Sequence, residues 1–304
     1  MTIAAYLLAY GAVVIWCAPA LLGRLTGAGL NPRLGVAAWL TAIAVVVLAW
    51  SVSVLVIVSA AVSGLPGSAT IVLCLEMIGV PERSLTPGVA SLVLLIVAGV
   101  VISTMVGIRV ARAVAGFRAR SDEHAQAARI IGTPTDRQDV FVIDAERAAA
   151  YCVAGRPHAI VLTTAAVRTL DEVQLGAVLA HEQAHLTGRH HHLLMVLRAL
   201  SHSLSRLPLF TRGVGAVAAL LEMCADDTAA RTHDRGALIA GMVKLAGPAP
   251  VGGLSVGAHA VHARVARLRD PAGPLTTGCH QILTVAVIAA TVCAPVLINL
   301  LCQH

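Results

Sequence analysis

Four long stretches of this 304-residue chain contain no Asp, Glu, Lys or Arg, and they restrict the fold more than any other feature. These stretches cover residues 1–23, 34–75, 84–108 and 271–304. Each can hold a helix of about 20 residues, which is the length that crosses a bilayer. Charged residues make up only 12% of the chain, roughly half the share that is usual in soluble domains. We therefore predict a mainly α membrane protein with transmembrane helices at 3–22, 36–62, 89–110 and 280–300.

The basic residues indicate how these helices are oriented. Nineteen of the 22 Lys and Arg residues lie from Arg109, at the end of the third predicted span, onward, and two more, Arg24 and Arg33, lie between the first two spans. The positive-inside rule places such segments in the cytoplasm, with both termini outside the cell membrane. We expect three regions: a membrane region at 1–115, a cytoplasmic domain at 116–275 and a last transmembrane helix at 276–304. No positive charge precedes the first apolar run, which favours a retained helix over a cleaved signal peptide.

Composition also bears on the partners of the chain. The net charge of +6 fits attraction to anionic lipid, so the bilayer is the first expected partner. Aromatic residues are only 3% of the chain and do not alternate with the basic residues, so we expect no direct nucleic-acid binding. The seven cysteines form no C-x-x-C pair, which argues against a disulfide framework, although a bridge between Cys74 and Cys302 is left open.

The predicted cytoplasmic domain begins with a polar connector at 111–138 and then a small sheet. Three short segments, at 139–144, 149–153 and 158–164, are strand-like, and the last of them is β-branched and apolar. Later in the domain, residues 193–221 are apolar but interrupted at Leu207-Pro208. We interpret them as two helices that pack on the domain or lie against the membrane, rather than as a fifth span. Residues 261–270 predict a basic amphipathic helix that contacts headgroups or docks on the domain.

An H-E-x-x-H motif follows the predicted strands. His181 and His185 lie one helical turn apart on one face, a spacing that suits two imidazoles on one zinc ion. Glu182 between them can act as general base toward a metal-bound water. We predict that the helix runs from Leu170 to Thr187, with Thr169 as N-cap and Glu172 completing a capping box.

Carboxylates further along the chain are candidates to complete the site. Glu222 and Asp226 share one helix face, and burying such a pair without a partner is costly. Zinc supplies a reason, with Glu222 as third ligand and Asp226 accepting from a ligand histidine. The alternative for Glu222 is an ordinary carboxylate near a helix start. Two histidines and a glutamate leave the fourth position open, as in catalytic zinc sites.

Other polar residues are weaker candidates. Any one of three could stabilise an oxyanion, although a structural ion pair is the more common role: Arg231, His233 and Arg235. We interpret the cluster His190-His191-His192 as a solvated helix end rather than a second metal site.

The motifs H-E-Q-A-H at 181–185 and E-M-C-A-D at 222–226 resemble those of gluzincin membrane peptidases. Two families share the pattern: the BlaR/MecR-type peptidases and the related HtpX-type quality-control peptidases. Three spans, a zinc domain and a fourth span look like the BlaR/MecR membrane module. No sensor domain follows the last span, so direct sensing of a β-lactam is not expected. The resemblance implies an α+β gluzincin domain, with Ile160, Val161 and Leu162 in the strand that binds substrate.

We therefore predict a zinc-dependent endopeptidase that cleaves a cytoplasmic protein, with a winged-helix transcriptional repressor as the first candidate by resemblance. Three alternatives stay open at this stage: quality control of membrane proteins, a zinc-binding sensor that signals through a partner without proteolysis, and a metal transporter. The transporter is the weakest, because the first three spans contain no His and, apart from Arg109 at the end of the third, no charged residue that could carry an ion. Assembly into a homo-oligomer is also left open.

Overall fold

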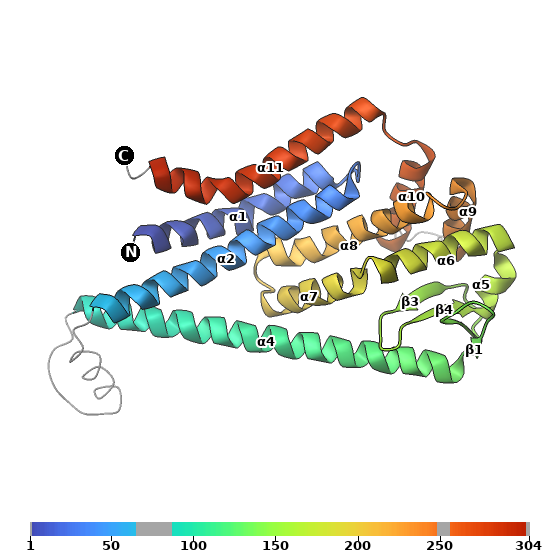
Figure 1. The fold of residues 1–304 in the computed structure, drawn as a ribbon, viewed down its shortest axis with the longest axis horizontal. Helices are drawn as coiled ribbons and strands as arrows, with labels where there is room; N and C mark the ends of the chain where they lie inside the picture. The colour runs from blue at the N-terminus through green and yellow to red at the C-terminus, as the bar shows by residue number, and fades with distance from the viewer. Residues whose placement is uncertain (1, 65–86, 248–255, 302–304) are drawn as a thin grey trace.

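The computed structural model describes residues 2–64, 87–247 and 256–301 (Figure 1). The described part is mainly helical with one small sheet, as predicted. The long helices are α1 (Thr2–Thr26), α2 (Pro32–Gly64), α4 (Pro87–Ile131), α8 (Pro208–Ala229) and α11 (Pro274–Leu301). The shorter helices are α5 (Thr164–Thr169), α6 (Glu172–Thr187), α7 (His190–Ser203), α9 (Arg235–Ala246) and α10 (Val256–Arg269).

Five helices in the described residues are long and apolar enough to cross a membrane, one more than predicted. Four of them, α1, α2, α4 and α11, contain the predicted spans. The fifth is α8, which starts at Pro208 after the predicted break. Half of its apolar window is buried inside the protein, against less than a third in each of the other four. The chain is thus a multi-pass membrane protein in which α8 also serves as a core helix.

Helix α4 is much longer than the predicted span at 89–110, because the segment that follows it is helical. The prediction of a polar connector from residue 111 was wrong: residues 111–131 are rich in Ala and Arg and contain no Pro, so they favour helix. The helix ends at Ile131, where Gly132 and Pro134 form the predicted break. One continuous helix therefore joins the apolar region to the sheet (Figure 1).

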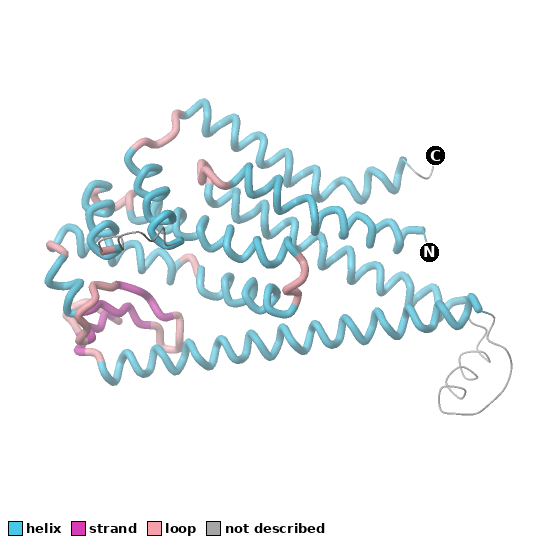
Figure 2. Tube along the Cα trace, turned by 180° about the vertical axis from the view of Figure 1, so that it is seen from behind, coloured by secondary structure: helices cyan, strands magenta, loops and turns pink. Residues whose placement is uncertain are grey.

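The apolar helices and the sheet lie at opposite ends of the molecule (Figure 1, Figure 2). The first turn of α1 and the last turn of α11 lie together at one end, and the sheet, α6, α9 and α10 lie at the other. The loop between α1 and α2 meets this second end, where Arg267 Nε donates to the Gly29 carbonyl at 2.7 Å. In the same loop, Asn31 Nδ2 donates to the Thr277 carbonyl at 3.1 Å.

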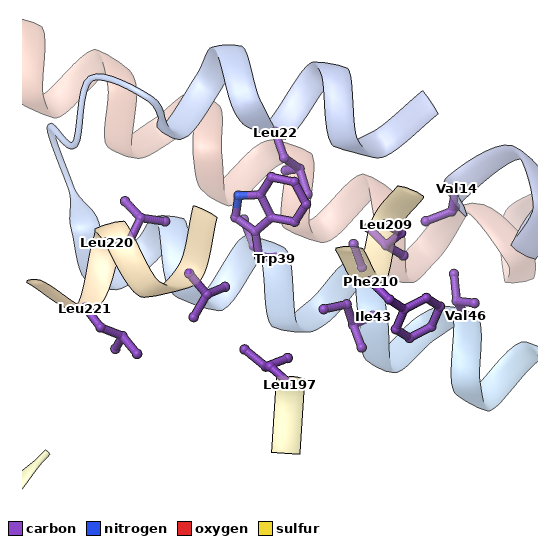
Figure 3. Close-up of a cluster of buried hydrophobic side chains, with 13 residues drawn as sticks. Val14, Leu22, Trp39, Ile43, Val46, Leu197, Leu209, Phe210, Leu220 and Leu221 are labelled. Atoms are coloured by element: carbon purple, nitrogen blue, oxygen red, sulfur yellow. The ribbon is translucent and has the colours of Figure 1, made fainter. Parts of the chain in front are cut away.

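The largest buried cluster joins α1, α2, α7 and α8 (Figure 3). Trp39 of α2 is 1% exposed, and its indole nitrogen donates to Thr26 Oγ1 at 3.1 Å. Phe210 and Leu209 of α8 pack in the same cluster. Gly213 allows α8 to approach closely, since a Cβ there would lie 3.3 Å from Trp39 Cε3. This cluster holds the helix that carries Glu222 against the membrane helices.

The sheet lies beside the far end of α4 and has the strand order β1-β2-β4-β3. Its strands are β1 (Thr133–Pro134), β2 (Val140–Ile143), β3 (Ala150–Val153) and β4 (Ala159–Thr163). The last three confirm the predicted strands. Strand β4 pairs in parallel with β2 and antiparallel with β3, so it is a central strand.

The prediction that Ile160, Val161 and Leu162 form a substrate-binding edge was therefore wrong. These residues lie in β4, are at most 3% exposed, and have neighbouring strands on both sides. A central strand has no free backbone groups to pair with another chain. The free edge next to β4 is β3, whose segment was predicted as a strand but not as the edge.

The start of α6 also differs from the prediction. Thr169 is the last residue of α5, and the N-cap of α6 is Asp171. The Asp171 side chain accepts from the Gln174 backbone at 2.8 Å, and Gln174 reaches back to the Asp171 backbone. The capping box therefore exists two residues later than predicted, while the end at Thr187 is confirmed.

Five cysteines in the described part are free, namely Cys17, Cys152, Cys224, Cys279 and Cys293. The bridge between Cys74 and Cys302 that the sequence left open lies outside the described residues.

Replacing Trp39 by Ala is expected to destabilise the full chain in detergent by about 3 kcal/mol, because it leaves a cavity among packed helices. Thermal unfolding measured by near-ultraviolet circular dichroism checks this. Trp16→Ala is the matched control, since Trp16 is 65% exposed. An equal fall in Tm for both variants would contradict the packing role of Trp39.

Candidate metal-binding active site

Three helices position the polar side chains of the candidate site. Helix α6 carries His181, Glu182 and His185, α8 carries Glu222 and Asp226, and α10 carries Arg264. The helices meet in a small cluster in which Ala177 of α6 and Ala229 of α8 are at most 1% exposed. Alanine at these contacts lets the helix axes come close enough for side chains on neighbouring faces to touch.

His181, His185 and Glu222 converge on one point, as predicted. Their candidate ligand atoms all lie within 4.8 Å of one another. Nε2 of His181 and Nε2 of His185 are 3.1 Å apart. The carboxylate of Glu222 lies 3.6 Å from the first nitrogen and 3.4 Å from the second. Two imidazole nitrogens and one carboxylate form the donor set of catalytic zinc sites and leave a fourth position open.

Asp226 lies behind His181, where the sequence placed it. Its side chain is fully buried, and Oδ1 is 3.0 Å from His181 Nδ1. That nitrogen is itself buried and makes no hydrogen bond of regular geometry. A carboxylate in this position orients a ligand histidine through the ring nitrogen that faces away from the metal.

Arg264 of α10 joins the two carboxylates of α8. Its Nε donates to Asp226 Oδ2 at 2.7 Å, and one terminal nitrogen donates to Oδ1 at 2.6 Å. The other terminal nitrogen lies 2.8 Å from Glu222 Oε2. A planar guanidinium matches a carboxylate with two parallel hydrogen bonds, so Asp226 is held in one orientation.

The protonation of the two histidines supports a cation between them. Burial lowers the pKa of His181, but the carboxylates of Asp226 and Glu222 beside its two ring nitrogens outweigh burial and raise the pKa to about 9. Burial lowers the pKa of His185 to about 4. Without a metal, one buried proton therefore sits where two nitrogens and a carboxylate meet. A divalent cation replaces that proton and satisfies all three groups, so the residues present fit zinc.

Glu182 projects into the same region beside Cys152 of β3. Burial raises the pKa of Glu182, against the opposing effect of the nearby His181 and of hydrogen bonds from Cys152. Burial also raises the pKa of the Cys152 thiol, and Glu182 adds to the effect. The Cys152 thiol is thus neutral at neutral pH. The raised pKa of Glu182 brings its proton affinity closer to that of the groups with which it would exchange protons.

A cleft of about 630 Å³ lies in front of these residues. It is bounded by α4, by strand β3 and by α7, and its lining includes His181, Glu182, His185 and Glu222. The extension of α4 beyond the predicted span forms one wall of the cleft through Phe117 and Arg120. The edge strand therefore faces the candidate catalytic residues.

The structure does not bring the other predicted residues to this cleft. Arg231 and Arg235 are exposed and line a separate hollow together with Asp227 and Arg267. His233 bonds to Thr232 Oγ1 at 3.0 Å, and its ring faces Gly176 near the start of α6. The possible oxyanion role of one of the three gains no support, because none of them lines the cleft that contains Glu182.

Sequence reasoning missed Arg264, Cys152 and the contact of His190 with the site. His190 Nδ1 lies 2.9 Å from His185 Nδ1, and His191 Nε2 lies 3.8 Å from Cys152 Sγ. Both histidines are half-buried, so only His192 fits the predicted solvated helix end. A signal for Arg264 was present: Arg264 and Arg267 are three residues apart on a helix, and they pair with the adjacent Asp226 and Asp227.

Comparison with known proteins identifies the central part of the chain. Residues 117–245 match the model of Peptidase family M48, whose members are zinc metalloproteases. The matched segment begins in the extension of α4 and ends in α9, so Arg264 lies outside it. No curated protein and no solved structure matches the chain. The central part of this membrane protein is thus similar to the M48 metallopeptidases.

Asp226→Asn is expected to weaken zinc binding about 10- to 100-fold, because the amide holds His181 less well than the carboxylate does. Competition of the purified full chain with a zinc chelator measures the change. Asp227→Asn is the neighbouring control: it removes the pair with Arg267, whose terminal nitrogens lie 2.7 and 2.8 Å from the carboxylate, and leaves His181 untouched. Equal losses in both variants would contradict a specific role of Asp226.

Arg264→Gln is expected to destabilise the zinc-free chain by about 3–5 kcal/mol, since it leaves the buried charge of Asp226 without its cation. The loss of Tm should be smaller in the zinc-loaded chain, where the metal offsets part of the negative charge. Arg269→Gln, at the exposed end of α10, is the control and should leave both Tm values unchanged. A loss of Tm that does not depend on zinc would contradict the electrostatic role.

Proposed function

We propose that this protein is an integral-membrane zinc endopeptidase that cleaves an extended segment of a protein substrate. The observation that carries the proposal is the convergence of His181, His185 and Glu222 beside Glu182 at the base of one cleft. The M48 domain at 117–245 supports the same reaction class. Zinc is the metal that this donor set fits best.

Glu182 is the general base and later the general acid of the proposed reaction. It accepts a proton from the attacking water and donates it to the amine that leaves when the peptide bond breaks. A zinc ion on His181, His185 and Glu222 would polarise the scissile carbonyl and acidify water. Burial raises the pKa of Glu182, which favours its acceptance of the proton from water.

Asp226 and Arg264 act as positioning residues rather than catalytic ones. Asp226 holds the ring of His181, and Arg264 holds Asp226 and Glu222 in place. Asp226 is buried and the Arg264 side chain is only 12% exposed, so the ligands are preorganised before a substrate enters. Preorganisation avoids the cost of ordering the groups during the reaction.

The substrate segment lies along β3 in this proposal. Strand β3 is an edge of the sheet and lines the cleft, so an extended peptide can add to it as a further strand. Cys152 in the middle of β3 contacts Glu182, so a peptide on this edge would pass the base. Tyr151 is 43% exposed on the same strand and offers an aromatic surface to the substrate.

We further propose that the peptidase domain lies in the cytoplasm and the termini outside, as the basic residues predict. The contact of the α1–α2 loop with α10 supports this arrangement, because that loop is flanked by Arg24 and Arg33. By resemblance to BlaR/MecR-type peptidases, the first candidate substrate is a cytoplasmic transcriptional repressor of the winged-helix type. Quality control of membrane proteins is the second candidate. A cleft formed partly by the helix that continues out of the membrane suits a substrate near the bilayer in either case.

Glu182→Gln is expected to abolish cleavage, with kcat at least about 100-fold lower, while zinc content stays near that of the wild type. Cleavage is measured on β-casein, on candidate repressors and on a model membrane protein with the full chain in proteoliposomes. Glu172→Gln, at the exposed start of the same helix, is the matched control and should retain activity.

Two results would overturn the proposed function. The first is equal cleavage by the wild type and Glu182→Gln. The second is a zinc-dependent response of a bound partner that survives Glu182→Gln while no substrate is cleaved, which would favour a non-proteolytic sensor. Preferential cleavage of the membrane protein or of a repressor by the wild type distinguishes the two substrate classes.

A further inference from the structure

Two arginines lie on opposite walls of the proposed catalytic cleft. Arg120 comes from the extension of α4 and Arg198 from α7, while burial lowers the pKa of the neighbouring His190 and His191. The acidic residues of the lining are Glu182 and Glu222 alone, and both belong to the catalytic centre. The part of the cleft that is left for a substrate is therefore positively charged.

The two arginines of the cleft have no acidic partner among the described residues. Arg120 and Arg198 are exposed and form no ion pair there, and Arg120 instead lies over the ring of Phe117 at 5.4 Å. Elsewhere Arg264 and Arg267 are both paired with carboxylates. Charges that a fold leaves unpaired around a cleft raise the local concentration of ligands of opposite charge.

The positive region continues into a smaller hollow of about 190 Å³ that shares Ser121, His191 and Met195 with the cleft. Arg118 and Arg156 line this hollow. Its one acidic residue, Asp122, accepts a hydrogen bond from the Arg156 backbone at 2.9 Å. A peptide that extends from the cleft in this direction would meet two more cations.

Other residues of α4 are better placed to contact lipid headgroups. Arg109 and Arg112 are exposed and lie directly after the apolar part of the helix. Arg120 lies about 12 Å further along the helix axis and lines the cleft instead. Arg109 and Arg112 therefore provide a matched control on the same helix.

We infer that the cleft selects substrate segments that carry Asp or Glu on either side of the scissile bond. Arg120 on one wall and Arg198 on the other would each pair with a substrate carboxylate. The inference rests on the proposed function, since it names the substrate class of that site. Exposed ion pairs are individually weak, so two of them are expected to give about five- to tenfold selectivity.

The test uses three libraries of random peptides in which two fixed positions, on either side of a variable core, are both Glu, both Gln or both Lys. The full chain is reconstituted in neutral lipid and loaded with zinc. Cleavage is followed by fluorescence. Binding is followed by anisotropy with zinc-loaded Glu182→Gln, which needs no catalysis.

We expect kcat/KM and binding affinity to be highest for the Glu library, intermediate for the Gln library and lowest for the Lys library. This selectivity should decrease between 50 and 500 mM NaCl, because salt screens the charges. The double variant R120Q/R198Q should lose the order, and R120K/R198K should keep it. R109Q/R112Q should keep it as well. Zinc content and Tm of each variant verify that the site is intact.

Equal rates and equal binding for the three libraries would overturn the inference, as would an unchanged order in R120Q/R198Q. It would also fail if R120Q/R198Q changed only the retention of the protein on anionic vesicles, which would assign these arginines to the membrane. If no library is cleaved but Glu182→Gln binds them in the expected order, the proposed peptidase activity fails while the acidic preference stands.

Discussion

The fully buried carboxylate of Asp226 is the constraint on which the rest of the site depends. A buried charge is tolerated only when other groups compensate it, and here Arg264 of α10 and His181 of α6 do so. Three helices are therefore tied to one carboxylate. His181 and Glu222 are held in place by the same contacts, so the metal ligands gain their geometry from the need to neutralise Asp226.

Helix α8 connects this network to the membrane helices. Its first half packs through Phe210 against the cluster around Trp39, and its last turns carry Glu222 and Asp226. The neighbouring Asp227 pairs with Arg267, which also donates to the Gly29 carbonyl in the first loop. A rigid helix with one end in the apolar core and the other at the site makes the position of Glu222 dependent on how α1 and α2 pack.

The cleft is likewise formed by two parts of the molecule, an apolar helix and the domain that contains the sheet. One wall is α4, which begins as an apolar helix and continues without interruption to Ile131, and another is β3 of the small sheet. Glu182, the proposed base, therefore faces a space formed jointly by an apolar helix and the domain that contains the sheet. Arg120 in the lining of this cleft belongs to the same helix as the third apolar segment.

Local chemistry allowed much of this protein to be predicted from sequence. Charge-free runs predicted four of the apolar helices, because the bilayer core excludes charges. The spacing of His181 and His185, and of Glu222 and Asp226, predicted the metal ligands, since one helical turn separates i from i+4. Strand segments were also found, but not their order. Residues 158–164 appear the most apolar because they form the central strand, which is the reason they are not the edge.

What only the tertiary structure decided concerns groups that meet from distant parts of the chain. Arg264 is 38 residues from Asp226 and 83 from His181, and periodicity along a helix does not encode such contacts. For the same reason sequence reasoning offered Arg231, His233 and Arg235, which are close to Glu222 in sequence but do not line the cleft. The sequence alone determined which residues can bind zinc and which helices can enter lipid, because both follow from local spacing and composition. Packing decided which arginine completes the site and which strand borders it, because burial and strand order depend on the whole fold.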